Sequence, residues 1–293
     1  MNNYPIVRVD TADGLGLHGM ISVPENQTRT IVINIHGSAS NFYHEHFYPA
    51  LTASITKLGV SFLSTNNRGS GVYDIEKGYV ATGASLEKFE DSVLDIDAWI
   101  EFSLQNGYEN IILEGHSFGT EKIVYYMSHG KYIDSVSALI LLGFSDSVGN
   151  QQRYEASINK SYFDEASNLM KNGSGETLLS DRYANAGELP ISAMTYLNFF
   201  ADGSELSKTL PLRNGTNLEI FKKIHVPIFC VISDNENEEY TQIPIKDALA
   251  LMKNENPMAE SAQIPDTNHC FESKENELAM IVSNFIKRHT SLI

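Results

Sequence analysis

One pentapeptide has the residue types and spacing of a serine nucleophile site. Gly115-His116-Ser117-Phe118-Gly119 directly follows the strand-like segment Asn110–Glu114 and precedes a segment with helical periodicity. G-x-S-x-G between a strand and a helix is typical of a sharp turn that projects the serine hydroxyl above a sheet. The flanking glycines allow close backbone approach, and the following helix N-terminus favours developing negative charge. The pattern predicts that Ser117 is an acyl-transfer nucleophile.

A second segment could stabilise the charge that forms during such a reaction. The apolar run Ile31–Ile35 ends in His36-Gly37-Ser38. Acyl transfer turns a carbonyl oxygen into an oxyanion, at which two backbone N–H groups must point. The residue after the nucleophile, Phe118, supplies one of them. Ser38 is the best candidate for the other, because the glycine before it allows a tight turn. We interpret the histidine of this segment as structural.

Both segments belong to a series of short apolar runs that predicts a mostly parallel sheet. The runs are Ile31–Ile35, Val60–Leu63, Ile111–Leu113, Ala138–Leu142 and Ile228–Ile232. Each is too short for a buried helix, and apolar character on both faces is typical of central parallel strands. Near the N-terminus, Ile6–Val9 and Leu15–Val23 flank Asp13-Gly14, which predicts an antiparallel hairpin at a sheet edge.

Segments with helical spacing of apolar residues alternate with these runs, as expected for βαβ units. They are Ser85–Leu104, with Ser85 as its capped start, Phe118–Met127 and Lys274–Arg288. From about residue 145 to 221 the sequence is polar and aromatic and has no strong strand pattern. Strand-like sequence resumes at Val226. We therefore predict a core domain of residues 1–144 and 222–293, interrupted by a helical cap of residues 145–221.

The chain resembles an α/β-hydrolase over its whole length. The resemblance is carried by the N-terminal hairpin, His36-Gly37 at a strand end, residues 67–71 (Asn-Arg-Gly-Ser-Gly) after the next strand, the Ser117 turn and an insertion after Phe144. It implies an eight-stranded, mostly parallel sheet flanked by helices and a Ser–acid–His triad in that chain order. Dehalogenases and epoxide hydrolases of this family use an aspartate nucleophile, so the serine implies an esterase-like member.

The resemblance implies that the histidine of the triad follows the last strand. His269 follows the strand-like Ser261–Ile264 and stands just before the final helix. There it would take the proton of the serine and later donate it to the leaving group. His44 and His46 form an H-x-H sequence that could line the pocket, but two ligands without a third do not indicate a metal site.

The acid of the triad is expected just beyond the strand 227–232, where carboxylates are abundant. Residue type favours Asp234. In related hydrolases a glycine closes this strand and the acid comes three residues later. Because Ser233 holds the glycine position, that spacing favours Glu236. We favour Glu236, with Asp234 as the main alternative and Glu238 as a further one. Any of these could orient the histidine and stabilise its charged form.

The sequence does not indicate a cofactor or a metal. It contains no G-x-G-x-x-G and no Walker sequence, and its two cysteines lack the paired spacing of zinc ligands. Cys230 lies in an apolar run and is interpreted as a core residue. The role of Cys270, directly after His269, stays open. Arg68 is interpreted as a residue that ties loops together rather than as an anion-binding one.

The amino-acid composition limits the classes of partner and substrate that we expect. The chain has 293 residues, with 21 basic and 37 acidic side chains, and a net charge of −16. This excess argues against nucleic acid, an anionic membrane or a strongly anionic substrate as partner. The N-terminus lacks the features of a signal peptide, and no apolar run approaches the roughly 20 residues of a membrane span. These features predict a cytoplasmic protein.

These patterns together predict a serine hydrolase that cleaves a carboxylic ester, or a related acyl bond, of a small to medium soluble substrate. An acyltransferase or cyclase, a thioesterase and an amidase use the same residues and stay open as alternatives. A ligand-binding protein without catalysis is a more remote alternative, because a fold can keep its pocket and lose turnover.

Overall fold

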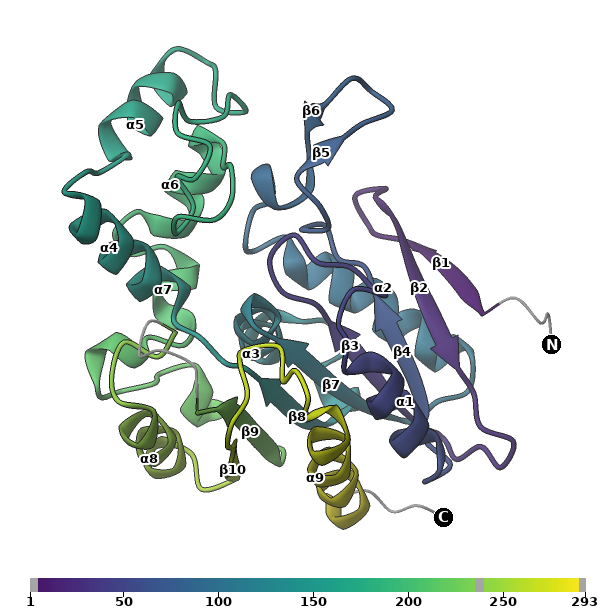
Figure 1. The fold of residues 1–293 in the computed structure, drawn as a ribbon. Helices are drawn as coiled ribbons and strands as arrows, with labels where there is room; N and C mark the ends of the chain where they lie inside the picture. The colour runs from purple at the N-terminus through teal and green to yellow at the C-terminus, as the bar shows by residue number, and fades with distance from the viewer. Residues whose placement is uncertain (1–4, 235–239, 290–293) are drawn as a thin grey trace.

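The fold is built on one eight-stranded sheet, and the computed structural model describes residues 5–234 and 240–289. The strand order is β1-β2-β4-β3-β7-β8-β9-β10 (Figure 1). β2 pairs antiparallel with β1 and β4, and the other pairs are parallel. The strands are β1 (Ile6–Asp10), β2 (Gly16–Ser22), β3 (Thr30–Ile35), β4 (Ser61–Thr65), β7 (Asn110–His116), β8 (Val136–Leu142), β9 (Ile228–Ser233) and β10 (Ala259–Ile264). The mostly parallel sheet and its antiparallel hairpin are confirmed.

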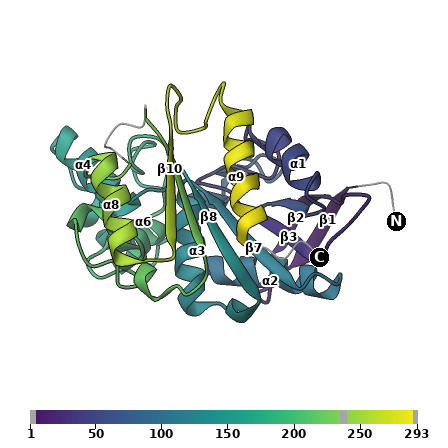
Figure 2. The same cartoon turned by 90° about the horizontal axis from the view of Figure 1, so that it is seen from below.

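Helices cover both faces of the sheet (Figure 2). On one face lie α1 (Tyr48–Thr56) and α9 (Glu275–His289), and on the other lie α2 (Ser92–Gln105), α3 (Phe118–His129) and α8 (Ile245–Glu255). Successive side chains of a strand point to opposite faces. Accordingly, Ile31 and Ile33 pack in the cluster that contains Trp99 of α2, whereas Val32 packs in the cluster that contains Phe285 of α9. Burial on both faces explains the continuous apolar runs.

The helix expected from Ser85 begins later than the apolar spacing indicates. A 3-10 turn spans Gly83–Ser85, and α2 starts at Ser92. The Ser85 hydroxyl donates to the carbonyls of Val72 and Pro190 at 3.2 Å each, so it does not cap a helix. The expected start was wrong because residues 85–91 dock on the segment near residues 190–198. The Phe89 N–H, for example, donates to the side chain of Asn198 at 2.8 Å.

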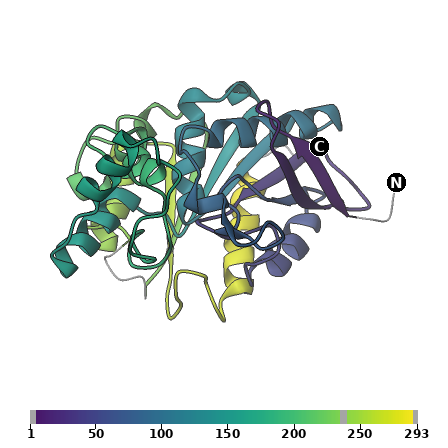
Figure 3. The same ribbon diagram turned by 90° about the horizontal axis from the view of Figure 1, so that it is seen from above.

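The segment between β8 and β9, called the inserted segment below, is helical in the structure. It contains α4 (Ser147–Ile158), α5 (Phe163–Lys171), α6 (Ala193–Phe200), α7 (Glu205–Thr209) and the 3-10 turns η3 (Leu212–Asn214) and η4 (Phe221–Lys223). Figure 1 shows α5 and α6 standing apart from the sheet, and Figure 3 shows the segment, in teal and green, beside the strands when seen from above. A short hairpin of β5 (Tyr73–Asp74) and β6 (Val80–Ala81) lies outside the main sheet.

The aromatic residues of this segment form a small core of their own. Tyr162, Tyr196 and Phe199 are buried together, and the cluster continues onto Phe118 and Tyr125 of α3. The ring centroids of Phe118 and Phe199 are 5.3 Å apart. The segment therefore packs against α3, the helix that begins directly after Ser117. This contact joins the segment to the Ser117 turn.

None of the helices within residues 5–234 and 240–289 combines the length and the apolar character needed to span a membrane.

A buried carboxyl group on β7 makes stability depend on pH. Glu114 is about 1% exposed, and Asn34 Nδ2 donates to its Oε2 at 3.0 Å. Burial raises the Glu114 pKa to about 8, with a smaller contribution from the nearby charge of Glu45. Burial also raises the pKa of Glu121 on α3 to about 8. Both groups therefore keep their protons in the folded state where the unfolded chain loses them.

We expect the free energy of unfolding to fall as pH rises from about 4.5 to about 8. The unfolded state binds fewer protons in this window, and each group contributes a slope of up to ~1.4 kcal/mol per pH unit. Glu114→Gln should remove its share and flatten the profile, since the amide oxygen can still accept from Asn34. Urea unfolding near both ends of the window measures this. An unchanged slope in Glu114→Gln would contradict the account.

Candidate active site

Ser117 sits on a strained turn between β7 and α3. Its φ of 54° and ψ of −126° lie in a region that side-chain-bearing residues rarely adopt. Gly119 is required here, because a Cβ on it would lie 2.1 Å from the carbonyl oxygen of Ile35. A Cβ on Gly115 would lie 2.6 Å from the carbonyl carbon of Gly119. The structure thus has the sharp strand-to-helix turn that the G-x-S-x-G spacing indicates.

Ser117 and His269 line one cavity of about 370 Å³. The walls combine the loop after β3, the Ser117 turn, the loop after β10 and the start and middle of the inserted segment. The lining residues are Gly37, Ser38, Ala39, Ser40, His44, Glu45, His116, Ser117, Phe118, Ser145, Ser147, Asn150, Asn185, Ala186, Glu188, Leu189, Tyr240, His269 and Cys270. Most of them are polar. The structure therefore brings Ser117, His269, Ser38 and Phe118 together at one hollow.

The imidazole of His269 is held by contacts on several sides. Its ring stacks on Tyr240 with a centroid distance of 4.1 Å and an interplanar angle of 5°. Gly143, with a φ of +56°, also lies close to the ring, since a Cβ on it would come within 2.9 Å of the His269 Cε1 atom. The backbone carbonyl of His269 lies 3.1 Å from Nε2 of His116, the residue before Ser117. The loop after β10 is thus fastened to the end of β7.

The loop after β3 packs directly on the Ser117 turn. A Cβ on Gly37 would lie 2.9 Å from the Cβ of Ser117, so only glycine allows this approach. The next residue, Ser38, is exposed at the cavity wall. Phe118, at the first turn of α3, lines the same cavity. The assignment of the Ser38 and Phe118 N–H groups to one oxyanion stays a prediction.

His36 acts as a structural residue in this loop. It is fully buried, and its Nδ1 lies 2.6 Å from the Gly37 carbonyl, to which it must donate. Its Nε2 accepts from the Asn67 N–H at 3.1 Å and lies 2.7 Å from the Ser70 hydroxyl. Burial lowers the His36 pKa to about 3, so the ring is neutral. This agrees with the structural interpretation from the sequence.

Arg68 and Lys122 tie the elements around the turn together. Arg68 lies 2.9 Å from Asp95 of α2 and 3.2 Å from Asp13 in the β1–β2 turn, which confirms its role in joining loops. Lys122 of α3 is completely buried and donates to Glu87 at 2.6 Å and to Asn67 at 3.2 Å. These pairs fix α3, which carries Ser117 at its start, to the loop after β4.

Of the candidate acids, Asp234 is described and Glu236 and Glu238 lie outside the described residues. Asp234 follows β9 and is exposed, and its N–H donates to the carbonyl of Ile264 at 3.2 Å. Its carboxylate oxygen lies 3.5 Å from the Thr267 N–H, two residues before His269. Asp234 is thus near the histidine loop, and the choice between it and Glu236 stays a prediction.

We expect Glu236→Gln to lower kcat by about 10⁴-fold, because an amide in the triad favours the wrong histidine tautomer. Asp234→Asn, the matched control on the same loop, should retain kcat within about fivefold, since an exposed carboxylate outside the triad contributes little. Ester hydrolysis at saturating substrate measures both variants. The reverse order of the two effects would assign the role to Asp234.

Several cavity residues could not be predicted from the sequence. Tyr240, which stacks on His269, and the polar residues Ser147, Asn150, Asn185 and Glu188 have no motif spacing. The four polar residues line the cavity because the segment between β8 and β9 folds beside the sheet, and Tyr240 comes from the chain after β9. Phe118 and Ser38 could be found because both neighbour a recognisable motif.

A family model described as "Protein of unknown function (DUF1749)" matches residues 72–291. The chain belongs to this family. The match begins after β4 and includes the Ser117 turn, the inserted segment and His269 of this DUF1749 member. No curated protein matches the sequence.

Solved structures show that this DUF1749 member has the α/β-hydrolase fold. A soluble variant of monoglyceride lipase from Saccharomyces cerevisiae, in complex with a substrate analogue, is 16% identical with a TM-score of 0.67, over 99% of this chain and 97% of that one. Est1E from Butyrivibrio proteoclasticus with bound ferulic acid is 16% identical with a TM-score of 0.65, over 97% and 98%. The Pyrococcus furiosus esterase Pf2001 is 17% identical with a TM-score of 0.59, over 98% and 91%.

Proposed function

We propose that this protein is a serine hydrolase that cleaves a carboxylic ester of a small to medium soluble substrate through an acyl-enzyme. The observation that carries the proposal is the strained Ser117 turn, which opens into the same cavity as the imidazole of His269. Strained backbone of this kind is retained where the surrounding structure holds it, commonly at active sites. The likeness to an esterase and a lipase in fold supports the reaction class.

In the proposed mechanism, Ser117 attacks the ester carbonyl while His269 accepts its proton. The N–H groups of Ser38 and Phe118 stabilise the oxyanion. Glu236 orients the histidine and stabilises its charged form. The histidine then protonates the leaving alcohol, and a water molecule releases the acid from Ser117 by the same steps in reverse order.

The cavity supports a substrate of modest size. A volume of about 370 Å³ is near the lower end of the ~300–1,000 Å³ range for small-molecule sites. Serine, asparagine and glutamate side chains make up much of its wall, which favours a substrate with polar groups near the scissile bond. We propose that residues 145–221 form a cap that selects the substrate, since Ser147, Asn150, Asn185 and Glu188 all come from this segment.

A panel of p-nitrophenyl esters of increasing acyl length, run beside thioester and amide analogues, tests this function. We expect the short and medium esters to be hydrolysed faster than the long ones, and faster than the amides. A preference for thioesters or amides, or transfer of the acyl group to an added alcohol in place of water, would replace the ester hydrolase by one of the alternatives. A steep rise in activity at an oil–water interface would contradict a soluble substrate.

A further inference from the structure

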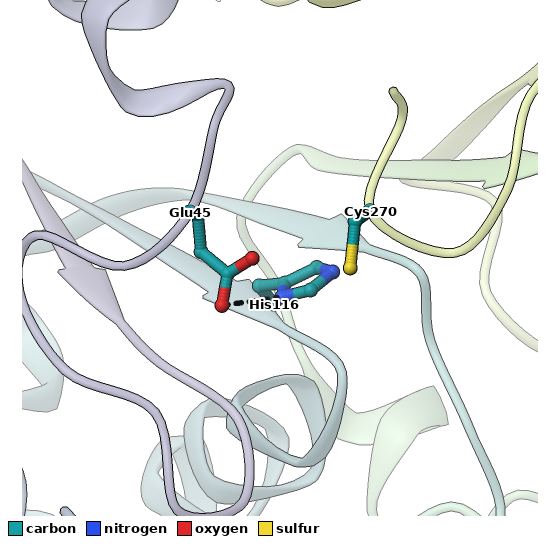
Figure 4. A group of neighbouring side chains, drawn as sticks. All are labelled: Glu45, His116 and Cys270. Atoms are coloured by element: carbon teal, nitrogen blue, oxygen red, sulfur yellow. Dashed lines mark ion pairs between the residues drawn. The ribbon is translucent and has the colours of Figure 1, made fainter.

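Three side chains beside the cavity have no part in the proposed hydrolysis. Glu45 precedes α1, His116 is the last residue of β7, and Cys270 follows His269 on the loop after β10. One carboxylate oxygen, one imidazole nitrogen and the thiol sulfur all lie within 4.8 Å of one another. Figure 4 shows the carboxylate and the sulfur on opposite sides of the His116 ring, each reaching it from a different part of the chain.

The donor set suits a metal ion of the zinc class, and one pair of donors has nearly the spacing that such an ion needs. A mixed set of sulfur, nitrogen and oxygen donors suits Zn²⁺ and related transition metals, whereas Mg²⁺ and Ca²⁺ prefer oxygen alone. The Glu45 carboxylate and His116 Nδ1 are 3.8 Å apart. That is too long for a hydrogen bond, but it is near the ~3.4 Å between two ligands placed about 2 Å from a tetrahedral ion.

The surroundings hold two of the donors in place. Glu45 is 6% exposed and accepts a hydrogen bond from the Ser40 hydroxyl at 2.7 Å, and His116 is 3% exposed and packs against the ring of Phe47. Cys270 is partly exposed, which gives an ion a route to the site. Because all three residues line the cavity, solvent can supply a fourth ligand. Three protein ligands and one open position are typical of reactive rather than structural zinc sites.

We propose that Glu45, His116 and Cys270 bind a divalent transition-metal ion of the zinc class, and that its binding slows the serine chemistry beside it. Binding releases the thiol proton to solvent and forms the metal–thiolate bond. Two of the ligands flank the proposed catalytic residues in sequence, since His116 precedes Ser117 and Cys270 follows His269. The ion would therefore join the two loops that must act together.

The charges near His269 predict that the bound ion slows the serine chemistry. The rings of His116 and His269 have centroids 5.0 Å apart. Without the ion, the Glu45 carboxylate contributes a negative charge near His269. An ion of charge +2, bound by that carboxylate and a thiolate, makes the group neutral. The imidazolium that forms on His269 during catalysis thus loses a favourable neighbour.

Binding is tested with Co²⁺ as the probe, since thiolate ligation gives a charge-transfer absorption band in the near ultraviolet. We expect the band in the wild type and in Cys230→Ala, which keeps Cys270 as the single thiol. Cys270→Ser should lose the band. Glu45→Gln should weaken Co²⁺ binding by at least about tenfold. Added Zn²⁺ should displace the Co²⁺ in the wild type. No band in the folded wild type, or an equal band in Cys270→Ser, would overturn the site.

The effect on catalysis rests on the proposed function and is tested separately. We expect excess Zn²⁺ to slow fluorophosphonate labelling of the chelator-treated wild type by at least about tenfold, a factor that corresponds to about 1.4 kcal/mol, and a chelator to restore it. In Cys270→Ser the ratio of rates with and without Zn²⁺ should stay near one. Equal rates in the wild type would overturn the coupling. A lack of labelling before Zn²⁺ is added would instead contradict the proposed hydrolase.

Discussion

Ser117→Ala is expected to lower kcat for p-nitrophenyl ester hydrolysis by at least about 10⁴-fold, because the proposed acyl-enzyme forms on the hydroxyl that is removed. Residual turnover should come from the oxyanion-stabilising N–H groups and from substrate binding alone. The variant should fold normally, since alanine at this position keeps the backbone of the turn and removes only the hydroxyl. Ser157→Ala, at the exposed end of α4, is the matched control and should retain wild-type kcat.

His269→Gln should lower kcat by a similar factor. The double variant Ser117→Ala/His269→Gln should have a kcat no lower than that of Ser117→Ala alone. In the proposed mechanism the two residues act as one unit, so the loss of either removes the same step. Initial rates at saturating substrate, with circular dichroism as a check on folding, measure the three variants. A double variant whose loss equals the product of the single losses would contradict a shared serine–histidine step.

Lys122→Met is expected to lower the free energy of unfolding by about 3–5 kcal/mol, the usual loss when one partner of a buried ion pair is removed. Lys122 and Glu87 are both almost completely buried, and their charged atoms lie 2.6 Å apart. Methionine fills most of the space of the lysine but leaves the Glu87 carboxylate without its counter-ion. Urea denaturation measures the change.

A double variant that replaces both partners distinguishes two contributions to the lost stability. One is the loss of the ion pair, and the other is the cost of leaving one buried charge without a partner. Lys122→Met/Glu87→Leu should recover most of the loss, because two apolar side chains leave no unpaired group. Lys208→Met is the control, since its partner Glu205 is 2.7 Å away but both side chains are partly exposed. It should change stability by less than about 1 kcal/mol. An equal effect of Lys122→Met and Lys208→Met would contradict the account.

The parts of the fold that follow from local chemistry could be predicted. Apolar runs such as Ile31–Ile35 identified the central strands because these strands are buried on both faces. The glycines around Ser117 identified the turn, because the close approach of Ile35 to Gly119 leaves no space for a side chain. In each case the sequence pattern and the packing have the same physical cause.

The parts that depend on contacts between distant segments could not be predicted. α2 begins at Ser92 and not at Ser85, because residues 85–91 contact the inserted segment and do not form the first turns of the helix. Tyr240 stacks on His269, but no sequence motif indicates this contact. Glu45, His116 and Cys270 are separated by most of the chain, so no ligand spacing in the sequence could indicate that they meet.

Labelling of the chelator-treated wild-type protein with a fluorophosphonate, followed by identification of the modified peptide, is the most direct test that Ser117 is the nucleophile. We expect rapid covalent modification of Ser117 in the wild type, and none in Ser117→Ala. His269→Gln, with its serine in place but without the general base, should be labelled far more slowly than the wild type. A folded wild type that stays unmodified, or a Ser117→Ala variant that is labelled as fast as the wild type, would contradict the account.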